Sequence, residues 1–135
     1  MKEQWLTIGQ VAAAAAVNVE TVRYYQRIGL VDKPPRPPQG FRHYPEETVR
    51  RIRFIKRAQQ LGFSLQDIAQ LLALYRESAC DDVRRQAEIR LAAIEAQIRD
   101  LQSMRRVLKR LVEQCRADAR DDYCPIVESL ARDQV

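Results

Sequence analysis

Apolar residues recur in steps of three and four along most of the chain, and this spacing predicts a mainly α-helical protein. Thr7, followed three residues later by Gln10, forms the capping box of a first helix from residue 8 to about residue 15. Asn18 is a typical N-cap for a second helix, from residue 19 to about residue 28, which a glycine then ends. Two short helices joined by a three-residue turn predict a helix-turn-helix.

The next segment, residues 31–40, contains four of the six prolines, which excludes a helix and predicts a stiff extended loop. The alternating residues 41–44 predict a short strand, so that loop and strand together have the form of a wing. Pro45 is then expected at the first position of a third helix that continues to residue 61. A further capping box predicts a fourth helix from residue 65 to about residue 76.

Between residue 80 and Pro125 the chain contains neither glycine nor proline, and its apolar residues keep the same helical spacing. This pattern predicts one helix of about 34 residues with a coiled-coil seam. Because a lone helix cannot bury such a stripe, we expect a second copy of the chain to cover it. A short helix over residues 126–130 is expected next. The seam consists of Val83, Ala87, Leu91, Ile94, Ile98, Leu101, Met104, Leu108, Leu111 and Cys115.

The predicted fold is mainly all-α: a winged helix-turn-helix DNA-binding domain followed by a long antiparallel coiled-coil dimerisation helix. Residues 1–76 form the first domain, and residues 77–135 form the dimerisation helix, a metal-binding C-terminal loop and a short helix. The length of 135 residues suits one medium domain or two small units. No apolar run reaches the roughly 18 residues of a membrane span, and no secretory signal is visible, so we expect a cytoplasmic protein without membrane contact.

The positive charge is concentrated in the first domain. Residues 1–76 contain 12 Lys and Arg against 6 Asp and Glu, a net charge of +6, whereas residues 77–135 have a net charge of −1. The basic half is therefore expected to bind a polyanion, with a solvated basic face as the alternative. We expect no enzyme, because the sequence shows neither a paired acid and base nor a phosphate loop.

Three cysteines cannot all pair within one chain, and in a reducing compartment metal binding or redox chemistry is the better interpretation. Cys80 and Cys115 are 35 positions apart. Because this spacing is roughly 52 Å along a helix, they cannot share a site within one chain. In an antiparallel homodimer, however, Cys80 of one chain would lie near Cys115 and Cys124 of the other. Cys80 and Cys124 both lie near predicted helix N-termini, where the helix dipole favours a thiolate.

Ligation by thiolates alone selects soft ions, and an all-sulfur site with three ligands suits mercury(II) best. A zinc finger is a poor match, because no C-x-x-C or Cys/His spacing is present. Two other interpretations stay open. The cysteines can be small buried side chains, or Cys115 and Cys124 can form a disulfide on oxidation, which would make the protein a thiol redox sensor.

Four segments carry a recognisable signature: LTIGQVAAAAAVNVETVRYYQRIGL, FRHY in the wing, VRRIRFIKRAQQLGFSLQDIAQLL before the long helix, and the three cysteines with CPIVESL. Together they resemble the MerR family of transcriptional regulators along nearly the whole chain. One departure is Ala16, where the family commonly has glycine in the turn, and slight strain is expected there. Asp118, Asp121 and Asp122 could support harder ions, so lead, cadmium and zinc remain alternatives to mercury.

The resemblance implies a homodimer bound to a double-stranded promoter whose spacer between polymerase contact elements is too long. It also implies that metal binding reorients the DNA-binding domains, so that the dimer untwists and bends the DNA and RNA polymerase activates resistance genes. Mercury(II) would be held by Cys80, Cys115 and Cys124. Arg23, Tyr24 and Arg42 are the first candidates for DNA contact, and the full set is Thr7, Thr21, Arg23, Tyr24, Arg27, Arg36, Arg42, Tyr44 and Arg53.

Overall fold

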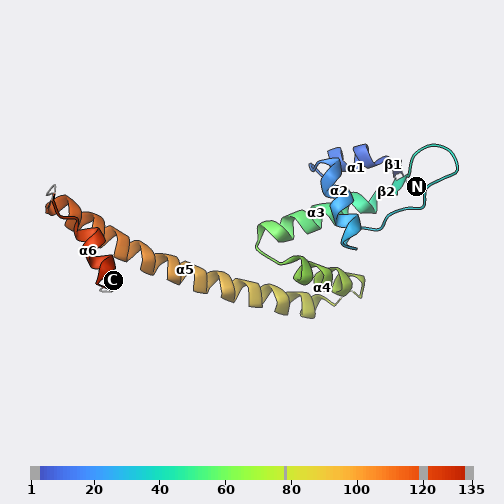
Figure 1. The fold of residues 1–135 in the computed structure, drawn as a ribbon. Coiled ribbons are helices and arrows are strands. Elements are labelled where there is room, and N and C mark those ends of the chain that lie inside the picture. Colours follow the sequence, from blue (N-terminus) through green and yellow to red (C-terminus); the bar gives the residue numbers. More distant parts are fainter. Residues whose placement is uncertain (1–3, 78, 119–121, 133–135) are drawn as a thin grey trace. The chain divides into compact units, whose positions relative to one another are not determined.

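The structure, a computed structural model, describes residues 4–77, 79–118 and 122–132. It is all-α in class, as predicted. In the described residues the order is β1 (Trp5–Leu6), α1 (Ile8–Ala14), α2 (Val19–Arg27), β2 (Tyr44–Pro45), α3 (Glu47–Gln60), α4 (Leu65–Arg76), α5 (Cys80–Ala117) and α6 (Pro125–Ala131) (Figure 1). The chain divides into two compact units, Met1–Arg84 and Arg85–Val135, with the division inside α5. The sequence predicts a division after residue 76, between a part that binds DNA and a part that dimerises and binds metal. That division of roles stays a prediction.

The capping signals of the sequence are present in the structure. The Thr7 side chain accepts a hydrogen bond from the Gln10 backbone N–H (3.3 Å), and the Gln10 side chain accepts one from the Thr7 backbone N–H (2.9 Å). Asn18 Oδ1 accepts from the Thr21 backbone N–H at 2.7 Å, and Gly29 follows α2 with a φ of 80°. These bonds satisfy N–H groups that helix geometry leaves without partners, so they fix where α1 and α2 begin.

The turn between α1 and α2 is a Schellman motif with alanine at the position that favours glycine. The Val17 N–H donates to the Ala12 carbonyl (3.0 Å), and the Ala16 N–H donates to the Ala13 carbonyl (3.2 Å). Ala16 has a φ of 57°, and it is the one non-glycine residue with positive φ in the described part of the chain. Its Cβ is strained in this left-handed conformation, as the departure from the family pattern predicts.

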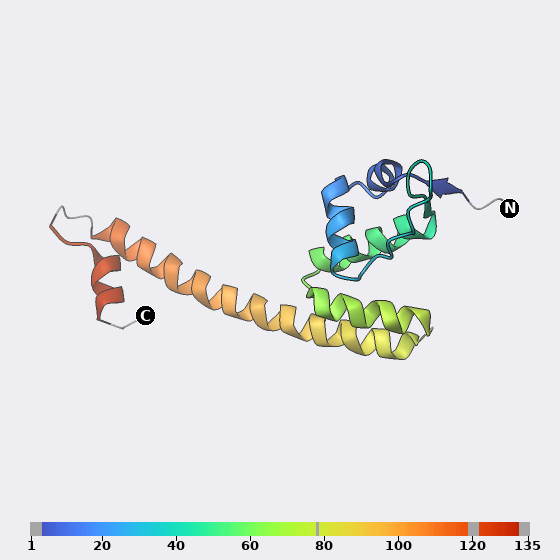
Figure 2. The ribbon, with the colours of Figure 1, turned by 45° about the vertical axis from the view of Figure 1, so that its right-hand side comes forward.

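The core of the first unit lies between α1, α2 and α3. Val11, Val22 and Ile52 are fully buried, on the apolar faces that the sequence spacing predicts, and Ile68 of α4 belongs to the same core. Figure 2 shows the blue helices α1 and α2 beside the green α3, with the segment 31–43 as an open loop. The outward face of α2 is therefore left free of the core.

Two details around the wing differ from the prediction. Residues 41–43 are irregular, and only Tyr44 and Pro45 form a strand, which pairs antiparallel with β1. A strand over 41–44 and a helix starting at Pro45 are therefore wrong, since α3 begins at Glu47. A proline fits this short edge strand because it has no N–H to leave unpaired, and its fixed φ also suits extended backbone.

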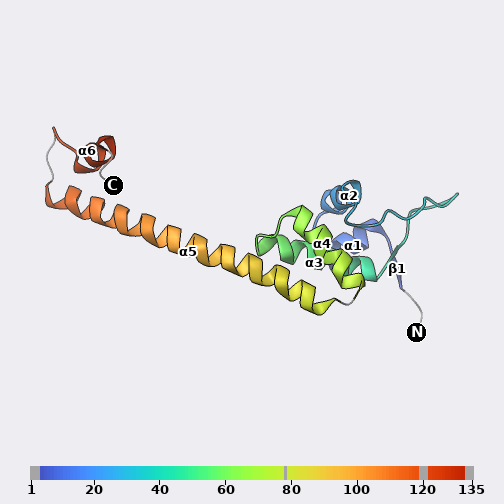
Figure 3. The same ribbon diagram turned by 90° about the horizontal axis from the view of Figure 1, so that it is seen from below.

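The second unit contains most of α5 together with α6, which folds back beside the end of α5 (Figures 1 and 3). The helix α5 has 38 residues. Leu111 is buried, whereas Leu91, Leu101 and Leu108 are 54%, 63% and 58% exposed. The apolar stripe of α5 is thus uncovered over much of its length in a single chain. No helix in the described residues is long and apolar enough to cross a membrane.

Replacing Ala16 with glycine should stabilise the protein, because glycine adopts a positive φ without strain at Cβ. We expect the free energy of unfolding to rise by roughly 0.5–1 kcal/mol, the relieved strain less the larger entropy of glycine in the unfolded chain. Urea unfolding at equal protein concentration measures this change. Ala13→Gly, at an exposed helical position of α1, is the matched control and should lower the stability. Equal effects of the two substitutions would contradict the strain at Ala16.

Candidate DNA-binding surface and cysteine site

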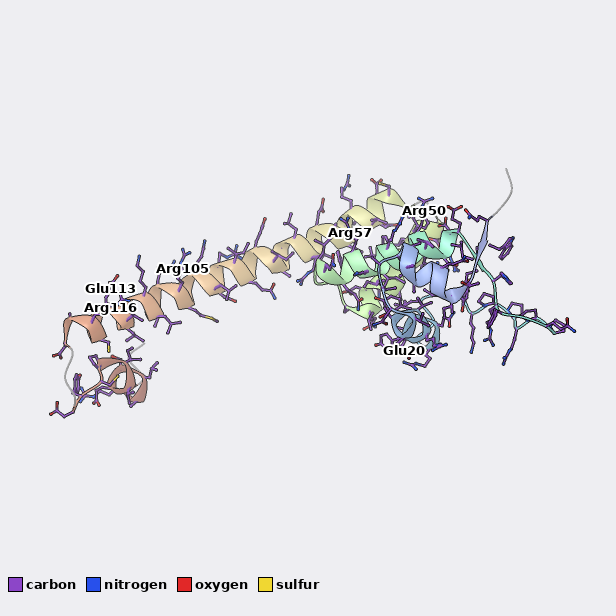
Figure 4. The ribbon with its side chains drawn as sticks, turned by 90° about the horizontal axis from the view of Figure 1, so that it is seen from above. Glu20, Arg50, Arg57, Arg105, Glu113 and Arg116 are labelled. Atoms are coloured by element: carbon purple, nitrogen blue, oxygen red, sulfur yellow. The ribbon has the colours of Figure 1, made fainter. Side chains whose placement is uncertain are left out.

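The outer face of α2 carries three of the predicted DNA-contact residues. Arg23 Nη1 lies 2.7 Å from Glu20 Oε1, and the two side chains are 55% and 72% exposed. The guanidinium carbon of Arg27 lies 5.8 Å from the centroid of the Tyr24 ring, in a cation–π contact. An exposed ion pair stabilises a fold only slightly, so the bond to Glu20, labelled in Figure 4, leaves Arg23 available to another anion.

Residues of α2 and of the proline-rich loop line a hollow of about 750 Å³ that is strongly basic. In the described residues its lining has five cationic side chains and no carboxylate, so its field attracts anions. Six of the predicted DNA-contact residues meet here. Lys33, Gln26 and Phe41 were not predicted, although Lys33 lies in the same basic segment as Arg36. The lining consists of Thr7, Ile8, Arg23, Gln26, Arg27, Lys33, Arg36, Gly40, Phe41, Arg42 and Tyr44.

Several of the predicted residues form hydrogen bonds within the protein, and Arg42, Tyr44 and Thr21 are among them. Arg42 Nε donates to the Pro34 carbonyl at 3.0 Å, so this side chain ties the two arms of the loop together. Tyr44 is 2% exposed, and its hydroxyl accepts a hydrogen bond from Gln26 Nε2. The Thr21 hydroxyl takes part in the N-cap of α2. The ring of Tyr44 is therefore part of the core, and its contact with DNA stays a prediction for the hydroxyl alone.

Arg53 is not among the residues that line the basic hollow. Its Nη2 donates to the Ala14 carbonyl at 2.8 Å, and Lys56 Nζ donates to the Ala16 carbonyl at 2.7 Å. Both carbonyls belong to the end of α1 and the turn that follows it. The basic side of α3 is therefore used in part inside the protein. The sequence carries no signal for this, because the acceptors lie about forty residues away along the chain.

Cys115 and Cys124 lie together in the second unit. Cys115 is half-buried near the end of α5, and Cys124 is exposed just before α6, close enough for the Cys115 side chain to influence the pKa of the Cys124 thiol. The pKa of the Cys124 thiol is lowered, chiefly by the backbone N–H groups of Val127 and Ile126, and Cys115 adds to this effect. A pair of thiols, one of which ionises readily, is a donor set that suits a soft metal ion.

Cys80 is exposed at the start of α5 and belongs to the first unit. Within the residues that the structure describes, no three side chains of metal-ligating type gather in one chain. Asp118 and Asp122 are exposed, and Asp121 lies outside the described residues. The two thiols near the C-terminus are therefore an incomplete site for the ligation by three cysteines that the sequence predicts.

A helix-turn-helix beside a basic hollow defines a DNA-binding protein, and known proteins specify the class. Residues 6–75 match the family described as "MerR HTH family regulatory protein", and residues 49–111 match "MerR, DNA binding". The chain belongs to the MerR family of transcriptional regulators, which bind promoter DNA and are not enzymes. The family resemblance of the sequence is confirmed.

One relative is the mercuric resistance operon regulatory protein of Serratia marcescens, 46% identical over 125 residues, which are 93% of this chain and 87% of the relative. The crystal structure of MerR from Bacillus megaterium in complex with mercury(II) is similar with a TM-score of 0.72 at 38% identity, over 93% of this chain and 99% of that chain. The regulator PbrR691 from Ralstonia metallidurans, in complex with lead(II), has a TM-score of 0.78 at 30% identity, over 93% and 98%.

The Cys124 thiol should be alkylated at lower pH than an ordinary cysteine, because the thiolate is the reactive form and its pKa is lowered. Iodoacetamide labelling of the reduced, metal-free protein, followed by mass spectrometry of the C-terminal peptide, gives the pH midpoint. The midpoint should rise in denaturant, where the N–H groups of Val127 and Ile126 no longer point at the sulfur. A folded-state midpoint at or above that of the denatured chain would contradict the assigned environment.

Proposed function

We propose that this protein is a metal-responsive transcriptional regulator that binds promoter DNA as a homodimer and responds to mercury(II). The observation that carries the proposal is that Cys115 and Cys124 lie close together, near the start of α6, whose backbone N–H groups lower the pKa of the Cys124 thiol. It occurs in a chain whose relatives include mercuric resistance regulators. Cys80 of a second copy would supply the third thiolate, since the pair in one chain is incomplete.

The three thiols fit mercury(II), because this soft ion prefers sulfur ligands. When bound, the ion would join Cys80 of one subunit to Cys115 and Cys124 of the other. The backbone N–H groups that begin α6 keep Cys124 ready to bind by favouring its thiolate. Asp118 and Asp122 are exposed oxygen donors nearby in sequence, and with them lead(II), cadmium(II) and zinc(II) remain alternative effectors.

The basic hollow supports DNA binding by the first unit. In this proposal Arg23, Tyr24 and Arg27 on α2 face the major groove, while Arg36 and Arg42 on the loop approach backbone phosphates. Few of these side chains can read base edges, so selectivity depends largely on the deformability of the DNA. On metal binding the dimer untwists and bends an over-long promoter spacer, which lets RNA polymerase contact both promoter elements.

The exposed apolar stripe of α5 supports the homodimer. It forms a shallow groove bordered by charged side chains that include Arg105, Glu113 and Arg116, labelled in Figure 4. Charged residues border the apolar seam of coiled coils in the same way. In an antiparallel pair the start of one α5 lies beside the end of the other, which would bring Cys80 to the Cys115 and Cys124 pair.

A second candidate function is thiol redox sensing, which the contact between Cys115 and Cys124 favours. One hydrogen peroxide molecule would oxidise the two thiols to a disulfide and be reduced to two waters. Metal titration and thiol counting separate the candidates. One mercury(II) bound per three thiols under reducing conditions supports metal sensing. Loss of two thiols per chain with peroxide, without tight metal binding, supports redox sensing.

The affinity for DNA should fall linearly in the logarithm of the salt concentration, because a basic surface displaces phosphate counterions. Arg42→Ala should weaken binding to unrelated duplexes by the same factor and reduce the salt slope by about 1, since one phosphate contact is lost. Fluorescence anisotropy with labelled duplexes measures both quantities. Arg99→Ala removes the same charge from α5 and should leave the slope unchanged. An affinity that does not depend on the salt concentration would contradict the assignment of DNA binding to the first unit.

The dimer should dissociate when a charge enters the stripe of α5. Leu101→Glu places a carboxylate opposite apolar side chains, and desolvating it there is unfavourable enough to give monomers. Sedimentation velocity gives the oligomeric state. Ser103→Glu adds the same charge two residues away, off the predicted seam, and should remain dimeric. A stable Leu101→Glu dimer would show that the interface lies elsewhere.

Mixing of variant subunits tests the shared metal site. Chains with Cys80→Ala, and chains with Cys115→Ala and Cys124→Ala together, should each fail to bind mercury(II) tightly as homodimers. A mixed dimer should regain one complete site, because the first chain keeps the thiol pair and the second keeps Cys80. Ligand-to-metal absorption in the presence of a competing thiol reports the binding. If heterodimers are shown to form and bind no more tightly than the homodimers, a site shared between subunits is ruled out.

A further inference from the structure

The helix α3 is hydrogen-bonded to the ends of both helices of the helix-turn-helix. Arg53 Nη2 donates to the last carbonyl of α1 at 2.8 Å, and Lys56 Nζ donates to a carbonyl of the turn that follows at 2.7 Å. Arg51 Nε donates to a carbonyl just after α2, and Gln59 Oε1 accepts a hydrogen bond from the hydroxyl of Tyr25 at 2.7 Å. Four side chains along α3 thus form hydrogen bonds with α1, with α2 and with the residues that directly follow these two helices.

The last carbonyls of α1 show why these bonds matter. The N–H groups of residues 15–17 satisfy the carbonyls of Val11, Ala12 and Ala13. The carbonyls of Ala14 and Ala16 receive Arg53 and Lys56 instead. Cations near the C-terminus of a helix are also favoured by the helix dipole. Lys56 therefore binds the very residue that is held at a φ of 57°.

We infer that Lys56 and Arg53 are positioning residues for DNA recognition, which hold the strained turn and thereby the angle of α2 against the DNA. The inference rests on the proposed binding of DNA through α2. It assigns Arg53 to the end of α1 and Lys56 to the turn rather than either to DNA phosphates, so Arg53 acts through the turn instead of by direct contact with DNA. The strain at Ala16 explains why this turn needs Lys56. Without the hydrogen bond from Lys56 to the Ala16 carbonyl, the strained turn would relax to another conformation.

The first test compares Lys56→Met, which keeps the alkyl chain, with Lys56→Arg and with Arg57→Met. Arg57 is an exposed neighbour on α3, labelled in Figure 4, and the last variant loses the same charge. A duplex selected from a random pool by the unmodified protein and a scrambled duplex of equal length are the probes. Lys56→Met should reduce the preference for the selected duplex by about tenfold, as expected for one lost charged hydrogen bond. Lys56→Arg should restore the preference.

Salt dependence separates positioning from contact with phosphate. For the scrambled duplex, the salt slope of Lys56→Met should equal that of Arg57→Met. A fall in affinity for both duplexes by one factor, with a slope reduced by about 1 relative to Arg57→Met, would overturn the inference in favour of a phosphate contact. An unchanged preference would overturn it as well.

Removing the strain should remove the requirement for Lys56. In an Ala16→Gly background, Lys56→Met should lower the preference by less than about threefold, because the two sites are coupled. An equally large loss in both backgrounds would show that Lys56 does not act through the turn.

Hydrogen exchange tests the turn without any DNA, so a failure of the proposed DNA binding does not affect this result. The amide protons of residues 16 and 17 should exchange faster in Lys56→Met than in Arg57→Met. When Ala16→Gly is added to both variants, this difference should disappear. Equal exchange in the two variants would overturn the inference. If instead exchange responds while no duplex is ever selected, the role of Lys56 at the turn stands and the DNA-binding proposal fails.

Discussion

A long helix with one apolar face must be covered, and this requirement governs the second unit of the protein. Leu91, Leu101 and Leu108 each expose more than half of their surface in a single chain. Burying such side chains contributes roughly 1.5–3 kcal/mol each, so a second α5 is a strongly favourable cover. In the proposed metal site, the same second chain would supply the third thiolate, from Cys80. In the proposed three-thiolate site, metal binding and dimerisation would be linked, and each would stabilise the other.

The helix-turn-helix depends on support from the rest of the first unit, because its two helices have only 7 and 9 residues. Helices this short are marginal in water, so they need tertiary support. The helix α3 provides it with a buried face around Ile52 and a polar edge that binds the ends of α1 and α2. Positive charges of α3 satisfy carbonyls within the protein. The hollow takes its charge from other segments, through Arg23, Arg27, Lys33, Arg36 and Arg42.

The features that were predicted from the sequence depend on neighbours in the chain. The starts of α1, α2 and α4 follow from N-cap residues that bond to the residue three positions later, and the core follows from helical spacing. The wing was placed wrongly because a strand of two residues is fixed by pairing with β1, which local propensity does not report. The burial of Tyr44 and the bond from Arg53 to α1 escaped prediction for the same reason. Both depend on partners that are distant in sequence.

The closeness of Cys115 and Cys124 allows either metal binding or disulfide formation, and one thiol pair cannot do both at once. A disulfide leaves no thiolate for a metal ion to bind, and both reactions begin from a thiolate, which the N–H groups at the start of α6 favour at Cys124. The third cysteine distinguishes them. A disulfide needs only the two thiols of one chain, whereas three-thiolate ligation also needs Cys80, which lies in the other unit. An oxidised pair would thus disable the metal site while leaving the stripe of α5 unchanged, so the protein could still form a dimer and bind DNA without responding to metal.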